Sequence, residues 1–155
     1  MGFSDKMRES LGAEGARVSV VTPEQPVERG SAATSTVVIH GGTQAARVDA
    51  LVVRVIEARR HWIDQAQNAD ITEEQAQQLE DRAHLMPAWT RTTIQEATID
   101  VAHEVLPGDT HEVPVQIAIP DNCGATAPSC VITLNAQADI KGQIDPTGNG
   151  RLQIF

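Results

Sequence analysis

Residues 106–120 read L-P-G-D-T-H-E-V-P-V-Q-I-A-I-P, a turn marked by glycine that leads into a run of alternating apolar residues. The apolar side chains occupy every second position: Val113, Val115, Ile117 and Ile119. The positions between them hold Glu112, Pro114, Gln116 and Ala118. Because successive side chains of a β-strand point to opposite faces of a sheet, this alternation predicts a strand with one face in a core and the other in solvent.

Similar strand-like runs recur along the chain between turn signals rich in Gly, Pro, Asn and Asp. The runs cover residues 17–22, 34–40, 48–59, 92–106, 112–119, 130–140 and 151–155. Several short strands without alternating helices favour an antiparallel β-sandwich over a parallel α/β sheet. A chain of 155 residues has the usual size of one domain, so we expect a single all-β domain over residues 1–155.

Residues 64–88 interrupt the strand pattern with a stretch rich in Ala, Gln and Glu. Thr72 and Gln75 have the spacing of a capping box, and apolar residues recur at helical spacing up to residue 86. Pro87 is expected to end this helix. The sequence therefore predicts a helical insertion between two strands. We favour a solvated connection, while a lid over a sheet edge and a partner-docking surface stay open as alternatives.

The quoted stretch resembles the pattern L-x-x-G-x-H-E-h-P-h-x-h-x-h-P of arrestin-like domains, in which h is apolar. A second match lies upstream, where residues 29–42 follow the spacing of the pattern P-G-E-x-V-x-G-x-V-x-I-x-G-G. Arg29, Ser31 and Ser35 depart from it, in place of proline, glutamate and the middle glycine. The resemblance implies an arrestin-like sandwich.

Three further segments resemble bacterial sporulation-control proteins related to Spo0M. They are the opening residues 1–12, the strand-like V-D-A-L-V-V-R-V at residues 48–55, and residues 134–154, which carry I-D-P where that family has V-D-P. The resemblance covers most of the chain and omits the segment from Asp64 to Trp89. It implies a non-catalytic adaptor that regulates sporulation, or a related developmental or cell-division programme, through protein contacts.

The chain has 21 acidic and 12 basic residues and a formal net charge of −9. This charge repels phosphate backbones, so we expect no nucleic-acid partner. The sequence has no apolar run near the length of a membrane-spanning helix and no basic-then-apolar leader at its start. We therefore expect a cytoplasmic protein without a transmembrane segment. Lys6 stands where a myristoylation motif has Ser or Thr, which argues against lipidation.

Motifs of the common enzyme classes are missing from the sequence: G-x-S-x-G, H-E-x-x-H, the P-loop and G-x-G-x-x-G. We therefore predict neither catalytic residues nor a cofactor. Cys123 and Cys130 lie six residues apart in one loop. In a reducing compartment two free thiols are the favoured interpretation, and a disulfide or half of a metal site are the alternatives.

A pair of His-Glu dipeptides is the main feature that suggests chemistry. If residues 107–108 form a two-residue turn, His103 faces Glu112 and Glu104 faces His111 across a hairpin. We favour polar pairing on the solvent face of a sheet. The alternative is a small metal- or ligand-binding module that uses these four side chains, although no third histidine stands at ligand spacing.

Residues 1–12 are expected to form a short helix that begins at Ser4 and ends at Gly12. Phe3, Met7 and Leu11 then share one side, which is a candidate surface for binding a protein partner. The alternative is that this side packs on the domain's own sheet. Exposed edge strands of an open sandwich can also accept another chain, which allows a homo-oligomer.

Overall fold

The computed structural model describes residues 15–155, and in this part of the chain it contains eight strands and one short helix. The strands are β1 (Arg17–Val21), β2 (Ala32–His40), β3 (Ala46–Asp64), β4 (Ala69–Ile71), β5 (Leu85–Val105), β6 (Thr110–Ala118), β7 (Cys130–Ile140) and β8 (Thr147–Leu152). The helix is α2 (Glu73–Gln77). The helix expected at residues 1–12 lies outside the described residues.

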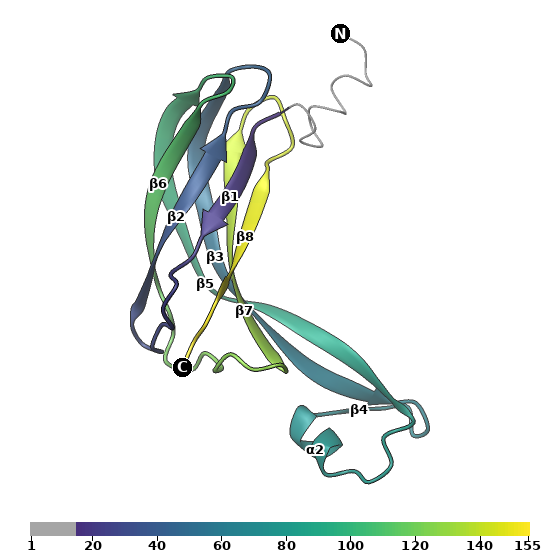
Figure 1. Ribbon diagram of the computed structural model, residues 1–155. Coiled ribbons are helices and arrows are strands. Elements are labelled where there is room, and N and C mark those ends of the chain that lie inside the picture. Colours follow the sequence, from purple (N-terminus) through teal and green to yellow (C-terminus); the bar gives the residue numbers. More distant parts are fainter. Residues whose placement is uncertain (1–14) are drawn as a thin grey trace, which may run out of the picture.

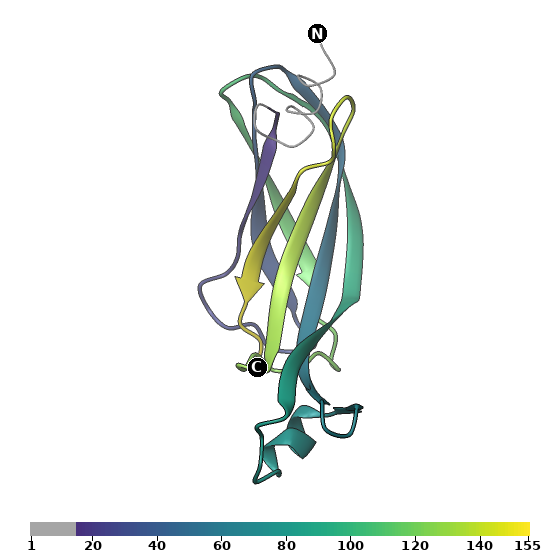
Figure 2. The same cartoon turned by 90° about the vertical axis from the view of Figure 1, so that its right-hand side faces the viewer.

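The strands form two antiparallel sheets that lie face to face (Figures 1 and 2). The first sheet has the order β1-β2-β6. In the second sheet β3 pairs with β5 on one side and with β7 on the other, and β8 follows β7. The short β4 pairs with the end of β3 that extends past β7. The prediction of an antiparallel β-sandwich is confirmed.

The hydrophobic core lies between the inner faces of the two sheets. Val113, Val115, Ile117 and Ile119 have exposed fractions of 9, 2, 2 and 1%, as the alternation of the sequence predicted. From the second sheet, alternate residues of β3 meet them, among them Leu51, Val53 and Val55, each with an exposed fraction of 0%. Both sheets therefore bury one face and leave the other to solvent.

The two lateral sides of the sandwich differ. On one side β1 lies close to β8, and Gly148 permits this approach because a Cβ there would stand 2.5 Å from the carbonyl oxygen of Val18. Val27 extends the closure through a bridge to Ile154 and a 2.7 Å hydrogen bond from its N–H to the carbonyl of Gln153. On the opposite side β5 and β6 are the outermost described strands of their sheets.

The insertion at residues 64–88 is mostly not helical, which corrects the prediction. Thr72 and Gln75 do form the expected capping box, but the helix they begin, α2, ends at Gln77. Strand β3 runs to Asp64, and β5 begins at Leu85 rather than at residue 92. Pairing between these two strands overrides the local helical pattern.

Among residues 15–155, the structure has no helix long and apolar enough to cross a membrane.

Candidate functional site

Strands β3 and β5 continue past the rest of their sheet and form a projecting arm (Figures 1 and 2). The last register pair of β3 with β7 joins Arg59 and Cys130, whereas β3 stays paired with β5 as far as Asp64 and Leu85. We call residues 60–89 the arm. It carries β4 and α2 at its end, so this part of the chain is displaced from the core and accessible from several sides.

Glu73 organises the end of the arm. Its carboxylate accepts hydrogen bonds from Nε and Nη2 of Arg60 (3.0 and 2.7 Å) and from Nε1 of Trp62 (2.6 Å). The hydrogen bonds from Arg60, Trp62 and Gln77 lower the pKa of Glu73 to about 2, against the opposing effect of burial. The guanidinium groups of Arg60 and Arg82 also lie 5.1 and 5.9 Å from the Trp62 ring centroid. These contacts hold α2 against β3.

Four large apolar side chains of the arm are exposed. Ile63, Leu79, Met86 and Trp89 have exposed fractions of 39, 41, 48 and 45%. Ile63 and Met86 are register partners on β3 and β5, so their exposed side chains lie side by side. The arm therefore presents an exposed apolar pair away from the core.

A cleft of about 460 Å³ lies where the arm leaves the sandwich, and Arg59, His61 and Ser129 are among the residues that line it. Several of its polar side chains already have partners within the chain. His61 contacts Asp70 through Nδ1 at 2.6 Å and Thr90 through Nε2 at 3.0 Å. The cleft thus presents side chains that hold the arm in place, and they do not form a nucleophile with an adjacent base.

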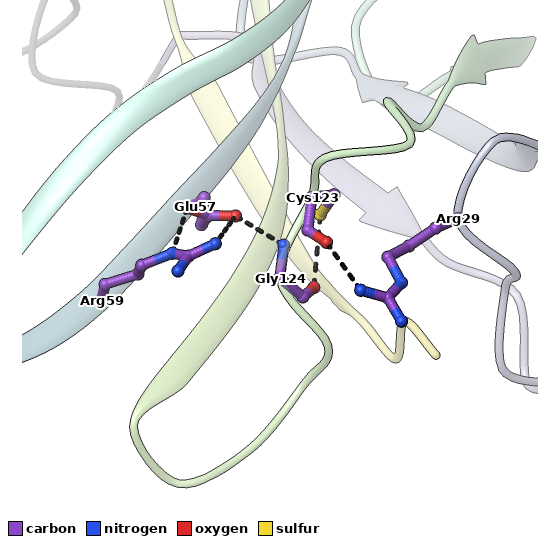
Figure 3. A network of polar contacts seen from close by, with 5 residues as sticks. All are labelled: Arg29, Glu57, Arg59, Cys123 and Gly124. Atoms are coloured by element: carbon purple, nitrogen blue, oxygen red, sulfur yellow. Dashed lines mark hydrogen bonds and ion pairs between the residues drawn. The ribbon is translucent and has the colours of Figure 1, made fainter. Parts of the chain in front are cut away.

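A polar network joins β3 to the loop between β6 and β7 at the base of the sandwich (Figure 3). Oε2 of Glu57 accepts a 2.8 Å hydrogen bond from the N–H of Gly124, and Arg59 donates to both carboxylate oxygens. Arg29 donates through Nη1 to the carbonyl of Cys123 at 3.4 Å. Burial raises the pKa of Glu57, but the hydrogen bonds from Arg59 and Gly124 outweigh burial and keep it below its usual range.

Cys123 and Cys130 are free and buried, in line with the favoured interpretation of the sequence. Burial, together with the negative charge of Glu57, raises the pKa of Cys123 to about 11 and also raises the pKa of Cys130. Both thiols are therefore protonated at neutral pH, and a protonated thiol is a poor nucleophile and metal ligand. Their contribution here is packing under the loop.

The expected His-Glu hairpin does not form, because β5 and β6 belong to different sheets. His103 is in register with Val48 of β3, and His111 is in register with Ile39 of β2. The two imidazole rings nevertheless stack, with centroids 3.9 Å apart and planes 13° apart. Burial, followed by the charge of His103, lowers the pKa of His111. The pair bridges the two sheets at one end of their open side.

The four side chains of the proposed metal module are therefore not arranged as predicted. Glu104 is in register with Arg47 of β3, and Glu112 with Val38 of β2. Within residues 15–155, no three His, Cys, Asp or Glu side chains come together in a group that could hold a metal ion. Phe3, Met7 and Leu11, the candidate partner-binding residues, lie outside the described residues and stay a prediction.

The backbone of β3 shows which groups of β5 face the open edge. The N–H of Gln65 donates to the carbonyl of His84, which directly precedes β5. The N–H of Arg60 donates to the carbonyl of Ser129, which directly precedes β7 on the other side of β3. Because hydrogen bonding alternates along an antiparallel strand, odd-numbered residues of β3 bond to β5 and even-numbered ones bond away from it. By register, the backbone groups directed to the open edge between residues 95 and 101 belong to Glu96, Thr98 and Asp100.

Two irregularities bound one straight stretch of this edge at residues 95–101; the other straight stretch, residues 85–93, contains Pro87. The register of β3 with β5 shifts once between Val55 and Ile56 and again between Val48 and Ala50. Next to the second shift, Ala102 has a φ of 47°. Bulges of this kind twist an edge strand and limit its pairing with other chains, so the stretch between them is the part suited to accept a strand.

Two acidic residues that organise the structure, Glu57 and Glu73, were not among the predicted site residues. Glu73 lies in the segment predicted as a helical insertion, and its partners Arg60 and Trp62 belong to β3, so no local pattern indicates these contacts. Glu57 and Arg59 had a usable signal, since residues two apart on a strand share one face. The free edge of β5 had none, because local sequence does not indicate which strand ends a sheet.

The described residues thus form an open antiparallel sandwich with a free edge and a projecting arm, an architecture of the arrestin-like class. The family model described as SpoOM protein (Spo0M) matches residues 4–155, so the chain belongs to the Spo0M family. The resemblance to sporulation-control proteins related to Spo0M, noted at residues 1–12, 48–55 and 134–154, is thereby confirmed.

A solved structure of the same family name has a similar fold. The crystal structure of Spo0M, a sporulation control protein from Bacillus subtilis, is similar with a TM-score of 0.66 and 18% identity. The match covers 90% of this chain and 49% of that one, so the chain spans about half the length of that relative. A DUF4466 family protein from Parabacteroides merdae matches with a TM-score of 0.46 and 8% identity over 92% of this chain and 44% of that one. Among curated proteins, no sequence matches.

Proposed function

We propose that the chain is a non-catalytic regulatory adaptor of the sporulation-control kind, and that it acts through protein–protein contacts in the cytoplasm. The observation that carries this proposal is the unpaired edge of β5, which leaves Glu96, Thr98 and Asp100 with backbone groups directed away from the sheet. An unpaired edge can accept an extended segment of another protein as an added strand.

The arm supports the same role. It displays Ile63, Met86 and Trp89 well away from the core, and Glu73 with Arg60 keeps its end ordered. Family membership supports the regulatory part of the proposal, since the Bacillus subtilis relative is described as a sporulation control protein. The buried free thiols of Cys123 and Cys130 fit a reducing compartment such as the cytoplasm.

In-cell photocrosslinking in a strain that depends on this chain tests the proposal. A photoreactive amino acid replaces Thr98 on the free edge, Met86 on the arm, or, as the control, Glu24 in the loop after β1. An adaptor is expected to yield a discrete adduct with the same protein from the edge or arm positions and not from the control. Adducts of equal pattern at all three positions would contradict specific contacts.

The N-terminal candidate surface enters the same experiment through a variant with Phe3→Asp, Met7→Asp and Leu11→Asp. Each variant is also returned to a strain without the gene, and the regulated process is scored. Loss of the adduct and of regulation in this variant would extend the contact surface to residues 1–12. An unchanged adduct would remove these three residues from the candidate site.

A further inference from the structure

We propose that the edge of β5 over residues 95–101 binds an extended, basic segment of a partner protein, in which apolar and Lys or Arg residues alternate. The inference rests on the proposed function, because it names the chemistry of the partner that the adaptor would hold. It follows from three properties of this edge: its free backbone groups, its half-covered inner face and its acidic outer face.

The backbone of this stretch is ready to pair. Glu96, Thr98 and Asp100 each direct an N–H and a C=O to the open edge, which gives an added strand three donors and three acceptors. The straight stretch of residues 95–101 is about 23 Å long at the usual rise of a strand, which suits a segment of similar length. The opposite lateral side of the sandwich is already closed by Val27 and Ile154.

The inner face of the stretch calls for apolar side chains. Ala97, Ile99 and Val101 pack against the core and are only partly buried, because β5 is the last strand of its sheet. An added strand would place every second side chain beside these residues and cover them further. Removal of apolar surface from water on binding is favourable. The inward positions of the bound segment are therefore apolar.

The outer face calls for positive charge. Glu96 and Asp100 project from it, and Glu104 follows beyond the bulge. Glu96 forms an ion pair with Arg54 at 3.1 Å, whereas Asp100 and Glu104 have no hydrogen-bond or ion-pair partner among residues 15–155. Side chains directly opposite on neighbouring strands lie about 4.5–5.5 Å apart, so Lys or Arg in the added strand would meet these carboxylates. The net charge of −9 would also attract a basic segment at long range.

The same charges argue against a second copy of the chain as the occupant. Antiparallel pairing of two β5 strands about Thr98 would set Glu96 of one copy opposite Asp100 of the other, twice. Like charges directly opposite are destabilising. A basic segment avoids this repulsion.

The edge of β6 is the weaker alternative. Ile119 exchanges backbone hydrogen bonds with residues 30–31 next to β2, so odd-numbered residues of β6 bond to β2 and even-numbered ones face the open edge. Pro114 is one of the edge-facing residues and has no N–H to donate. Its ring interrupts the donors in the middle of this edge.

The test uses a fluorescently labelled seven-residue peptide in which Lys and Val alternate. One control, the block peptide, has the same composition but groups all Lys residues before all Val residues. The other control is a peptide in which Glu and Val alternate. Binding is measured by fluorescence anisotropy at low and high salt. The key variant is Thr98→Pro. The proline removes one N–H that faces the open edge and leaves every hydrogen bond to β3 in place. Pro87 already occupies such an edge-facing position earlier on β5. Its matched control is Gln116→Pro, which places proline on the edge of β6.

We expect the alternating peptide to bind at low salt, more weakly at high salt, and at least ten-fold more tightly than either control peptide. Thr98→Pro, and separately Asp100→Lys with Glu104→Lys, should each weaken binding at least ten-fold. Gln116→Pro and the charge control Glu24→Lys should leave it unchanged. The charge variant decides the matter if Thr98→Pro does not fold, as judged by circular dichroism.

Equal binding of the block peptide, or no effect of the β5 variants, would overturn the proposal. If only Gln116→Pro abolishes binding, the peptide site lies on the edge of β6. If the chain is a dimer and Thr98→Pro makes it monomeric, the edge of β5 is occupied by a second copy of the chain. If these results come with specific crosslinks from Met86 in cells, the adaptor function stands and only the basic segment is refuted. If the crosslinks are also absent, both proposals fail.

Discussion

Removal of the Glu57 carboxylate should detach the loop between β6 and β7 from β3 and lower the free energy of unfolding. The structure separates two contributions. The charge-assisted hydrogen bond from the N–H of Gly124 is partly buried and is worth about 1.5–3 kcal/mol. The ion pair with Arg59 is weaker, about 0–1 kcal/mol, because 57% of the Arg59 side chain is exposed.

Three variants distinguish these contributions in urea unfolding followed by circular dichroism. Glu57→Ala should lower the free energy of unfolding by about 2 kcal/mol, since the partly buried N–H of Gly124 loses its charged acceptor. Glu57→Gln keeps an acceptor and should cost about 1 kcal/mol. Arg59→Ala should cost no more than about 1 kcal/mol. An Arg59→Ala variant as unstable as Glu57→Ala would refute this assignment.

The pH dependence of the same contribution has a definite sign. The pKa of Glu57 is lower in the folded chain than in the unfolded chain, where it is about 4.3. The stabilisation is therefore fully present above pH 4.3, approximately, and is lost as the pH falls through the lowered folded pKa. The stability difference between the wild type and Glu57→Gln should be constant at neutral pH and should shrink in acid.

Three further changes test other parts of the structure. Ser35 has a buried hydroxyl without a hydrogen-bond partner among residues 15–155, so Ser35→Ala should raise the urea midpoint by the equivalent of about 1 kcal/mol; a lower midpoint would show that the hydroxyl is bonded. Gly148→Val should destabilise the fold by about 1–3 kcal/mol, because its side chain would meet the backbone of Val18, and an unchanged midpoint would contradict the close approach of β1 and β8. The pKa of Glu73 is about 2 in the folded chain and about 4.3 in the unfolded chain, so the stabilisation from its ion pair is fully present above about pH 4.3 and is lost as the pH falls toward 2. Trp62 fluorescence, measured in a Trp89→Phe background, should be constant from about pH 7 to 4 and change below about pH 3. The Glu73→Gln variant should show the low-pH signal at every pH.

The strand β6 was predictable because alternation is a local property. Val113 to Ile119 show the period of two on their own, and any sandwich that buries one face of the strand satisfies it. The family patterns added the arrestin-like arrangement, which periodicity alone does not provide. The fold class was therefore accessible from the sequence.

The arm was not predictable from local pattern. Residues 64–86 are rich in Ala, Gln and Glu, which favour helix, yet β3 and β5 pair at both ends of this stretch. Pro87 was interpreted as a helix stop, whereas it lies in an edge strand at a position whose N–H would face solvent. Tertiary pairing decided the outcome at this point.

The candidate hairpin failed for a similar reason. The short link at Pro107 and Gly108 suggested that β5 and β6 pair, but each strand pairs in a different sheet, with β3 and β2 respectively. The sequence did place His103 near His111, and the stacked rings confirm that proximity without the predicted pairing. Which residues face the open edge depends on the order of strands, and that order is a property of the whole fold.

Amide hydrogen exchange of β5, measured by NMR with and without the alternating Lys-Val peptide, tests the central claim most directly. In the free chain the amides of Glu96, Thr98 and Asp100 should exchange quickly, while those of Ala97 and Ile99 are protected by β3. The peptide should slow exchange at the first three. Slow exchange at Thr98 without peptide, or protection that appears only on β6, would contradict a free β5 edge that receives a partner strand.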